Sequence, residues 1–373
     1  MKARKDEWLT TILFCTFLGI MPLLFWLLPK AEFSQTEKRF LEKAPVLSAE
    51  TLSSGKFGND AEKYMADHLP GRNFFVGLNA YVDLCSGKQV TKDIYVANNN
   101  RLVEAPVQWD QMQVDKNINA ISTFAEKLGR PVEFMLVPSA GWAAKEQIKG
   151  LYDPYHDAEI IEDIYNQAKT DNVIYRELLH VFENQPQLYY KTDHHWTSEG
   201  AYKAYAAYME EKGREYPNAD QFAVETVDGF RGTTYSRSAL WLTPAESVQL
   251  WTYSKNLQVT INGSEDVHQG AFYKERLKDA DMYTVFLNGT QGMIRIDNPD
   301  NVGKGSILVI RDSYSSCFAP MLAESYETVI LLDMRWTDQS ALELCEEMDF
   351  DDVLICYSLS NFMTDSNFYK LKY

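Results

Sequence analysis

Three short apolar runs in the last third of the chain limit the fold more than any other feature. They are "SILVI" (306–310), "TVILL" (328–332) and "DVLIC" (352–356), and each has its single polar residue at the start. Runs without polar alternation suit strands buried on both faces, as in a parallel sheet. Helix-like segments over 316–325 and 339–348 separate them. The pattern predicts an α/β fold whose functional residues lie at the carboxyl ends of the strands.

The N-terminus supplies a second constraint. Residues Trp8 to Leu28 form a run of 21 residues without a charge, and at about 1.5 Å per residue such a helix matches a hydrocarbon core of about 30 Å. Three basic residues precede the run, which orients the remaining chain outside the cytoplasm. A cleaved signal peptide is the alternative, but the run exceeds a usual signal h-region and no small-x-small cleavage site follows it. We therefore predict a single-pass signal anchor that contacts the lipid bilayer through residues 8–28.

The remaining chain is predicted to contain a linker and one large domain. Residues 1–30 form the anchor, residues 31–56 are polar with weak periodicity and suit a juxtamembrane linker, and residues 57–373 form the domain. Within it, residues 214–280 follow no clean helix or strand pattern, and we interpret them as an irregular or β-rich insertion.

Composition excludes one class of partner. The chain has 36 basic and 53 acidic residues and a net charge of −17, a field that repels nucleic acid. Its cysteines have neither CxxC nor metal-ligand spacing, so no disulfide framework and no cysteine metal site is predicted. Two of them could pair in an oxidising compartment; the five are Cys15, Cys85, Cys317, Cys345 and Cys356, and the candidate pair is Cys345 with Cys356.

Two adjacent histidines stand out in "YYKTDHHWTSEGAY" (189–202), because the chain has only six. Asp193 precedes His195 by two residues, a spacing at which a carboxylate can fix one imidazole nitrogen and leave the other to accept a proton. We expect His195 to take part in the chemistry and His194 to have a structural role, since the side chains of adjacent residues point in different directions on a strand or a helix. Two alternatives remain: a metal site formed by Asp193, His194 and His195, or a structural cap for a helix over 198–212.

A serine occupies the position where such a base would find a nucleophile. Ser313 lies in "RDSYSS", directly after the run 306–310 and before a predicted helix. The backbone N–H groups of Ser313 and Tyr314 would point at an oxyanion there, and the helix dipole would favour its charge. Ser313 could instead be a simple helix cap, and Ser139 in "VPSA", after another predicted strand, is a similar competitor.

Five motifs together resemble a known family. In order they are "DHLPGR" (67–72), "YYKTDHHWTSEGAYKAY" (189–205), "FRGTTYS" (230–236), "YTVFLNG" (283–289) and "VIRDSYSSCFAPMLAESY" (309–326). This set resembles the DHHW proteins, which are similar to alginate O-acetylation proteins of the AlgJ and AlgX type. The resemblance extends from about residue 57 to the end of the sequence. It implies an SGNH-hydrolase-like three-layer α/β/α fold with a mostly parallel sheet, here preceded by one transmembrane helix.

The resemblance also implies site residues and a function. Its order, aspartate and histidine before serine, selects Ser313 over Ser139 and makes Ser313, His195 and Asp193 the expected triad, with no metal or cofactor. It adds Arg335 in "DMRW" as a substrate or oxyanion contact, although Arg335 could simply pair with Asp333. Further oxyanion candidates are Asn288 and Asn361, and Arg311 stands where these enzymes usually carry glycine.

The implied activity is transfer or removal of acetyl groups on a cell-envelope polysaccharide, outside the cytoplasm. A membrane-bound O-acyltransferase would be a plausible acyl donor. The aromatic residues near the motifs could stack on sugar rings or belong to the core: Trp196, Tyr202, Tyr314 and Trp336. The alternative function is a catalytically silent module that binds glycan or an envelope assembly partner at the same place.

Overall fold

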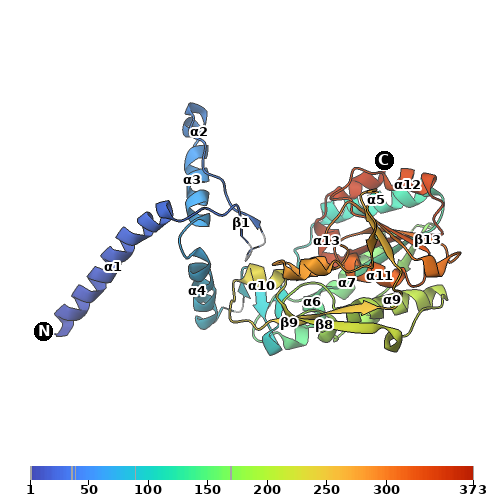
Figure 1. The fold of residues 1–373 in the computed structure, drawn as a ribbon, viewed down its shortest axis with the longest axis horizontal. Helices are drawn as coiled ribbons and strands as arrows, with labels where there is room; N and C mark the ends of the chain where they lie inside the picture. The colour runs from blue at the N-terminus through green and yellow to red at the C-terminus, as the bar shows by residue number, and fades with distance from the viewer. Residues whose placement is uncertain (1, 35–36, 38, 89, 169, 373) are drawn as a thin grey trace. The chain divides into compact units, whose positions relative to one another are not determined.

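The computed structural model describes residues 2–34, 37, 39–88, 90–168 and 170–372. The chain divides into two compact units (Figure 1). The first contains residues 1–88 and a short later segment, 236–241; the second contains residues 89–235 and 242–373.

The first unit is mostly helical. Its long N-terminal helix includes the stretch Glu7–Leu27, which is apolar and long enough to cross a membrane by length and composition. The elements of this unit are α1 (Lys2–Leu27), β1 (Phe33–Ser34), β2 (Arg39–Phe40), α2 (Ala49–Ser53), α3 (Lys56–Asp67) and α4 (Arg72–Cys85). The predicted linker over 31–56 thus contains a two-stranded sheet and a short helix.

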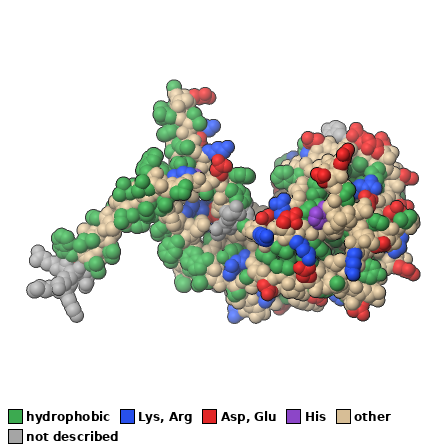
Figure 2. All heavy atoms as spheres, viewed as in Figure 1, with side chains coloured by type: hydrophobic (Ala, Val, Ile, Leu, Met, Phe, Trp, Pro, Cys, Tyr) green, Lys and Arg blue, Asp and Glu red, His purple; other side chains and the backbone are tan. Residues whose placement is uncertain are grey.

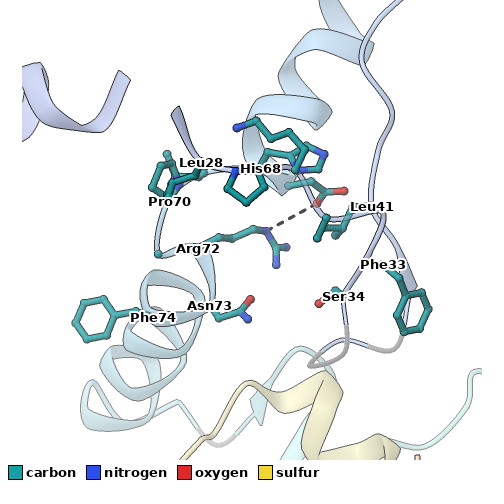
Figure 3. Close-up of a pocket in the computed structure, with 15 residues that line it drawn as sticks. Leu28, Phe33, Ser34, Leu41, His68, Pro70, Arg72, Asn73 and Phe74 are labelled. Carbon is teal, nitrogen blue, oxygen red and sulfur yellow. Dashed lines mark ion pairs between the residues drawn. The ribbon is translucent and has the colours of Figure 1, made fainter. Parts of the chain in front are cut away.

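The motif "DHLPGR" forms the tight connection between α3 and α4. Gly71 has a φ of 70°, a left-handed conformation that glycine adopts without a Cβ penalty. Arg72 then turns back to Asp67 (Nε–Oδ1 3.8 Å) and to Glu37 (Nη1–Oε1 2.6 Å). Figure 3 shows Arg72 and its ion pair with Asp67 at a pocket of about 440 Å³ that Leu28, the residue after α1, also lines.

The second unit is built on an eight-stranded sheet in the order β11-β10-β12-β14-β13-β15-β6-β7. The five strands from β14 to β7 are parallel, whereas β10, β11 and β12 pair antiparallel. Their bounds are β6 (Val132–Val137), β7 (Val173–Arg176), β10 (Gln258–Ile261), β11 (His268–Gln269), β12 (Met293–Asp297), β13 (Ser306–Arg311), β14 (Thr328–Leu332) and β15 (Asp352–Ser358). The predicted mostly parallel α/β sheet is therefore confirmed.

Helices cover both faces of this sheet, as the three-layer prediction requires (Figure 1). One core joins β13 residues such as Leu308 to α5 (Gln111–Leu128), α7 (Asp157–Gln167), α12 (Ala341–Glu347) and α13 (Leu359–Thr364). The other joins β13 residues such as Val309 to α9 (Ser198–Lys212) and α11 (Ser315–Leu322). Successive side chains of β13 enter opposite cores, which explains its unbroken apolar sequence.

Smaller elements complete the second unit. They are the sheet β3 (Val90–Thr91), β4 (Ile94–Val96) and β5 (Leu102–Glu104), the hairpin β8 (Ala223–Phe230) and β9 (Glu246–Thr252), and the helices α6 (Ala140–Ala143) and α8 (Leu179–Phe182). Helix α10 (Thr233–Ser238) begins in this unit and ends in the first.

Two predicted boundaries differ from the structure. A domain was expected from residue 57, but α3 and α4 lie in the first unit, because Gly77 of α4 packs against the Trp241 ring and not in either core of the sheet. The segment 214–280 is rich in strands, but β10 and β11 within it extend the main sheet, so it is not wholly an insertion. Cys345 and Cys356 belong to opposite cores and are both free thiols.

Candidate active site

The carboxyl end of β13 carries Ser313, in the turn that precedes α11. Its Oγ lies 2.8 Å from Nε2 of His195, which comes from the loop before α9. Ser139, the competing serine, instead caps α6, where its Oγ accepts from Trp142 N–H. The structure thus brings His195 to Ser313, the serine that the resemblance selects.

Asp193 completes a chain of three hydrogen-bonded side chains. Its Oδ1 lies 2.5 Å from Nδ1 of His195 and also accepts from the backbone N–H of His195 at 2.9 Å. This double contact fixes the ring and places the Nδ1 proton toward the carboxylate, so that Nε2 faces Ser313 as an acceptor. The arrangement of Asp193, His195 and Ser313 is the one expected from the sequence.

Asp193 is held by a motif to which the sequence assigned no role. In "FRGTTYS", the N–H of Thr233 donates to Oδ2 of Asp193 at 2.6 Å. Gly232 lies so close that an added Cβ would be 2.2 Å from Oδ2 of Asp193. A side chain at this position would displace the carboxylate, so Gly232 and Thr233 position the aspartate.

Aromatic rings hold the histidine. Tyr283, from the motif "YTVFLNG", stacks on His195 at 3.9 Å between centroids and 8° between planes. The ring of His194 lies 4.0 Å from that of His195. The prediction that the two histidines diverge is therefore wrong, because residues 192–195 form bends and no regular strand or helix.

The charges of the site favour a neutral histidine beside an ionised aspartate. Burial lowers the pKa of His195, and the neighbouring His194 lowers it further, against the opposing effect of Asp193. Burial alone would raise the pKa of Asp193, but the charges of both histidines and the hydrogen bonds from His195 hold it well below its usual range. A neutral imidazole can accept a proton, which suits a general base.

The predicted oxyanion donors are only partly in place. Tyr314 N–H donates to Oδ1 of Asp312 at 3.0 Å, so it is engaged within the protein. No hydrogen bond from the N–H of Ser313 is seen among the described residues, which leaves this amide as the candidate donor. The Tyr314 side chain is buried, and its hydroxyl donates to the carbonyl oxygen of His194.

The other expected substrate contacts make different interactions. Arg335 binds Asp333 through Nε at 2.9 Å and Nη2 at 2.7 Å, the alternative foreseen for it. Asn288 accepts from Arg276 at 2.6 Å, and none of its described contacts reaches the triad. Asn361 donates to Oδ2 of Asp312 at 2.8 Å, so its amide supports the turn instead of facing a substrate.

Two adjacent charged residues, Arg311 and Asp312, are buried beneath the turn that carries Ser313. Oδ2 of Asp312 accepts from Ser358 N–H at 2.9 Å and Ser358 Oγ at 2.8 Å, in addition to Asn361. Arg311 is fully buried and donates to the Ser316 hydroxyl at 3.0 Å. Burial lowers the pKa of Arg311, and Asp333 opposes that shift. The Arg311 side chain, which stands in place of the usual glycine, is therefore enclosed by the protein and bonded to the helix that follows Ser313.

Of the four aromatic candidates for sugar stacking, three belong to the core. Trp196, Tyr202 and Tyr314 are buried, whereas Trp336 is 67% exposed. Trp336 follows the carboxyl end of β14, the strand next to β13. It is the member of this group that a sugar could contact.

The metal alternative has the required closeness but competes with existing bonds. The ligating atoms of Asp193, His194 and His195 lie within 4.8 Å of one another. However, Nδ1 of His195 bonds Asp193 and Nε2 bonds Ser313, so a metal would have to displace one of these partners. The observed bonding therefore fits a triad better than a ligand set.

Comparisons with known proteins agree with the sequence motifs. The model of the DHHW protein family matches residues 159–332. The structure of a DHHW family protein from Eubacterium siraeum has a TM-score of 0.63 and 22% identity, and covers 76% of this chain and 96% of that one. Bacillus cereus PatB1 has a TM-score of 0.61 and 18% identity, with coverage of 75% and 99%.

A second PatB1 structure, which carries a sulfonyl adduct, gives a TM-score of 0.60 and 19% identity, and covers 75% of this chain and 98% of that one. Comparison with curated proteins finds no match. At these identities the structural likeness shows a shared fold. The predicted resemblance to the DHHW proteins is confirmed over residues 159–332, the segment that contains the Asp193-His194-His195-Trp196 sequence and Ser313.

Proposed function

We propose that this protein is a membrane-anchored, extracytoplasmic acyltransferase or esterase that moves or removes acetyl groups on a cell-envelope polysaccharide. The observation that carries the proposal is the continuous bonding from Asp193 through His195 to the Ser313 hydroxyl, with distances of 2.5 Å and 2.8 Å. Such a chain is the arrangement by which a weak hydroxyl nucleophile is activated.

The chemistry follows from this geometry in two balanced steps. Ser313 Oγ attacks the acyl carbonyl and gives its proton to Nε2 of His195, which passes that proton to the departing alcohol. The result is an acyl ester on Ser313. An acceptor hydroxyl then gives its proton to His195 and attacks the same carbonyl carbon, so that the acyl group leaves and Ser313 recovers its proton. The Ser313 N–H and the N-terminus of α11 would stabilise the oxyanion in both steps.

The envelope setting is supported by the apolar span Glu7–Leu27 and by the resemblance to DHHW proteins. A membrane-bound O-acyltransferase is the proposed source of acyl groups. Exposed Trp336 offers a flat ring near the carboxyl ends of β13 and β14, and rings of this kind stack on sugars.

The direct test is covalent trapping on the full chain in detergent. Incubation with an aryl acetate, followed by peptide mass spectrometry, is expected to find acetyl on Ser313. A Ser139→Ala variant is the matched control, because Ser139, like Ser313, lies between a parallel strand and a helix, and this variant should label normally. Folded protein with neither label nor turnover would instead support the silent binding module.

The pH dependence of activity should reveal the lowered pKa of His195. A lowered pKa means that the imidazole loses its proton at a lower pH, so the base form is present over a wider range. We expect kcat/KM for an aryl acetate to rise with pH through a midpoint below 6.5, the usual histidine value, and then to stay level through neutrality. Since His194 contributes to the lowering, His194→Gln should move the midpoint upward. A wild-type midpoint above 7 would contradict the assignment.

Transfer and hydrolysis differ in which hydroxyl reaches the acyl-enzyme. A bound sugar is better positioned than water, so an acceptor oligosaccharide should speed turnover and carry the acetyl group afterwards. We expect Trp336→Ala to reduce this acceleration severalfold while leaving hydrolysis of the aryl acetate unchanged, because the ring is exposed and, in the part of the chain that the structure describes, no ring contact joins it to His195. Fast hydrolysis that no envelope oligosaccharide alters would identify an esterase.

A further inference from the structure

Helix α4 carries an apolar stripe that the rest of its unit leaves uncovered. Phe74, Leu78 and Val82 recur every four residues and therefore lie on one face of the helix. They are 56%, 43% and 56% exposed. Figure 2 shows hydrophobic side chains along the surfaces of both α1 and α4. Contiguous exposed apolar surface of this kind marks an interaction site.

A different side of α4 makes its internal packing. Gly77 and Ala80 are buried, and an added Cβ on Gly77 would lie 2.0 Å from the Trp241 ring. The Phe74 ring also meets the edge of this contact, stacking on Trp241 at 5.7 Å. Packing against Trp241 thus fixes the rotation of the helix, and that rotation turns Leu78 and Val82 outward.

The neighbouring helix α1 indicates what covers the stripe. The Phe75 ring of α4 lies 6.2 Å from the Phe17 ring of α1. Phe17 is ten positions before Leu27, where α1 ends, which corresponds to about 15 Å along the helix axis. The Phe75 side chain at the start of α4 therefore reaches the apolar span, which a lipid leaflet would surround.

The charges around α4 are paired and concentrated at its two ends. Arg72 at the start bonds Glu37 at 2.6 Å, and Lys88 beyond the end bonds Asp83 at 2.7 Å. Arg72 lines the pocket of Figure 3 together with Leu28, the residue that follows the end of α1. Paired charges at the ends and an uncharged stripe between them suit a helix that lies in the membrane interface.

We propose that α4 is an interfacial helix whose stripe, Phe74, Leu78 and Val82, contacts the acyl chains of the outer leaflet. This inference rests on the proposed membrane anchoring of α1. The lipid surface is favoured over a second copy or a partner helix because Phe75, one position after Phe74, meets Phe17 of α1, and the same leaflet would surround the exposed apolar surface of α1.

The test measures depth in the membrane at two adjacent positions. Leu78→Cys and Asn79→Cys are made separately in the full chain with Cys15→Ser and Cys85→Ser, since the other three cysteines are buried. Both target residues are exposed on the same helix, but they face directions about 100° apart. Each protein is reconstituted into phosphatidylcholine vesicles and spin labelled. Collisions of the label with oxygen, which enriches in lipid, are compared with collisions with a water-soluble nickel complex.

We expect the ratio of oxygen to nickel collisions to be severalfold higher at position 78 than at position 79. Alkaline carbonate releases proteins that are not anchored in the bilayer. If the protein resists this extraction but positions 78 and 79 give the same water-like ratio, the inference is overturned and the anchoring stands. The label at position 78 could instead be shielded from both reagents and show spin–spin broadening that grows with protein density. That result would identify a second copy on the stripe and would also overturn the inference. Extraction by carbonate would overturn both the anchoring and this inference.

Discussion

Replacing Ser313 or His195 by alanine is expected to lower kcat with an aryl acetate by at least about 10³-fold, because residues that act as one nucleophile-base unit fail together. The Oγ of Ser313 and Nε2 of His195 are 2.8 Å apart, within reach of direct proton transfer. The measurement is single-turnover release of the aryl alcohol by the full chain in detergent. For the same reason, the double variant Ser313→Ala/His195→Ala should be little slower than either single one.

Two controls separate chemistry from folding. His194→Ala should retain most of the activity, since His195 is the histidine that lies within hydrogen-bond distance of Ser313 Oγ and Asp193 Oδ1. Each inactive variant should keep the thermal unfolding temperature of the parent within a few degrees. Independent losses that multiply in the double variant would show that Ser313 and His195 do not act as a unit.

Asp312→Ala is expected to produce the largest loss of stability, about 3–5 kcal/mol in the free energy of unfolding. The carboxylate is fully buried and accepts four hydrogen bonds, from Tyr314 N–H, Ser358 N–H, Ser358 Oγ and Asn361 Nδ2. Its removal leaves these donors without a partner and deprives buried Arg311 of a nearby negative charge. Guanidinium unfolding followed by tryptophan fluorescence measures the change.

Two further variants define the cause. Asp312→Asn should cost less than Asp312→Ala, because the amide oxygen can take the Oδ2 position and keep three of the four bonds, while the amide nitrogen faces the N–H of Tyr314 and cannot accept from it. Asp349→Ala removes an exposed aspartate whose ion pair with Arg130 is 3.6 Å long, and it should change stability by less than about 0.5 kcal/mol. A loss below about 1 kcal/mol for Asp312→Ala would show that the turn does not depend on this carboxylate.

The parallel part of the sheet could be predicted because burial on both faces removes polar alternation. The runs at 306–310, 328–332 and 352–356 correspond to β13, β14 and β15. The antiparallel strand β12 was not predicted, since its alternating "MIRID" buries only one side chain in two. Its pairing with β14 joins residues 31 or more positions apart, and no local pattern reports such a contact.

The contact between the side chains of the proposed triad was likewise predictable, whereas the residues that support them were not. Asp193 and His195 are two residues apart, so their contact is local and visible in the sequence. Tyr283, Gly232 and Thr233 contact them across 39 or more positions of the chain. The signal that could have found them was the presence of all three in the motifs "FRGTTYS" and "YTVFLNG".

The short segment 236–241 has a consequence for how this gene can be shortened or recombined. The polypeptide leaves the second unit after residue 235, contributes Trp241 to the first, and returns after residue 241. The first unit is therefore discontinuous in sequence and cannot be exchanged as an N-terminal cassette. A protein expressed from residue 89 onward would contain Trp241 but would lack the residues against which it packs, Gly77, Phe74 and Tyr81. A protein that starts near residue 31 retains all of these packing partners. When segments are exchanged between related proteins, positions 77 and 241 should come from the same parent.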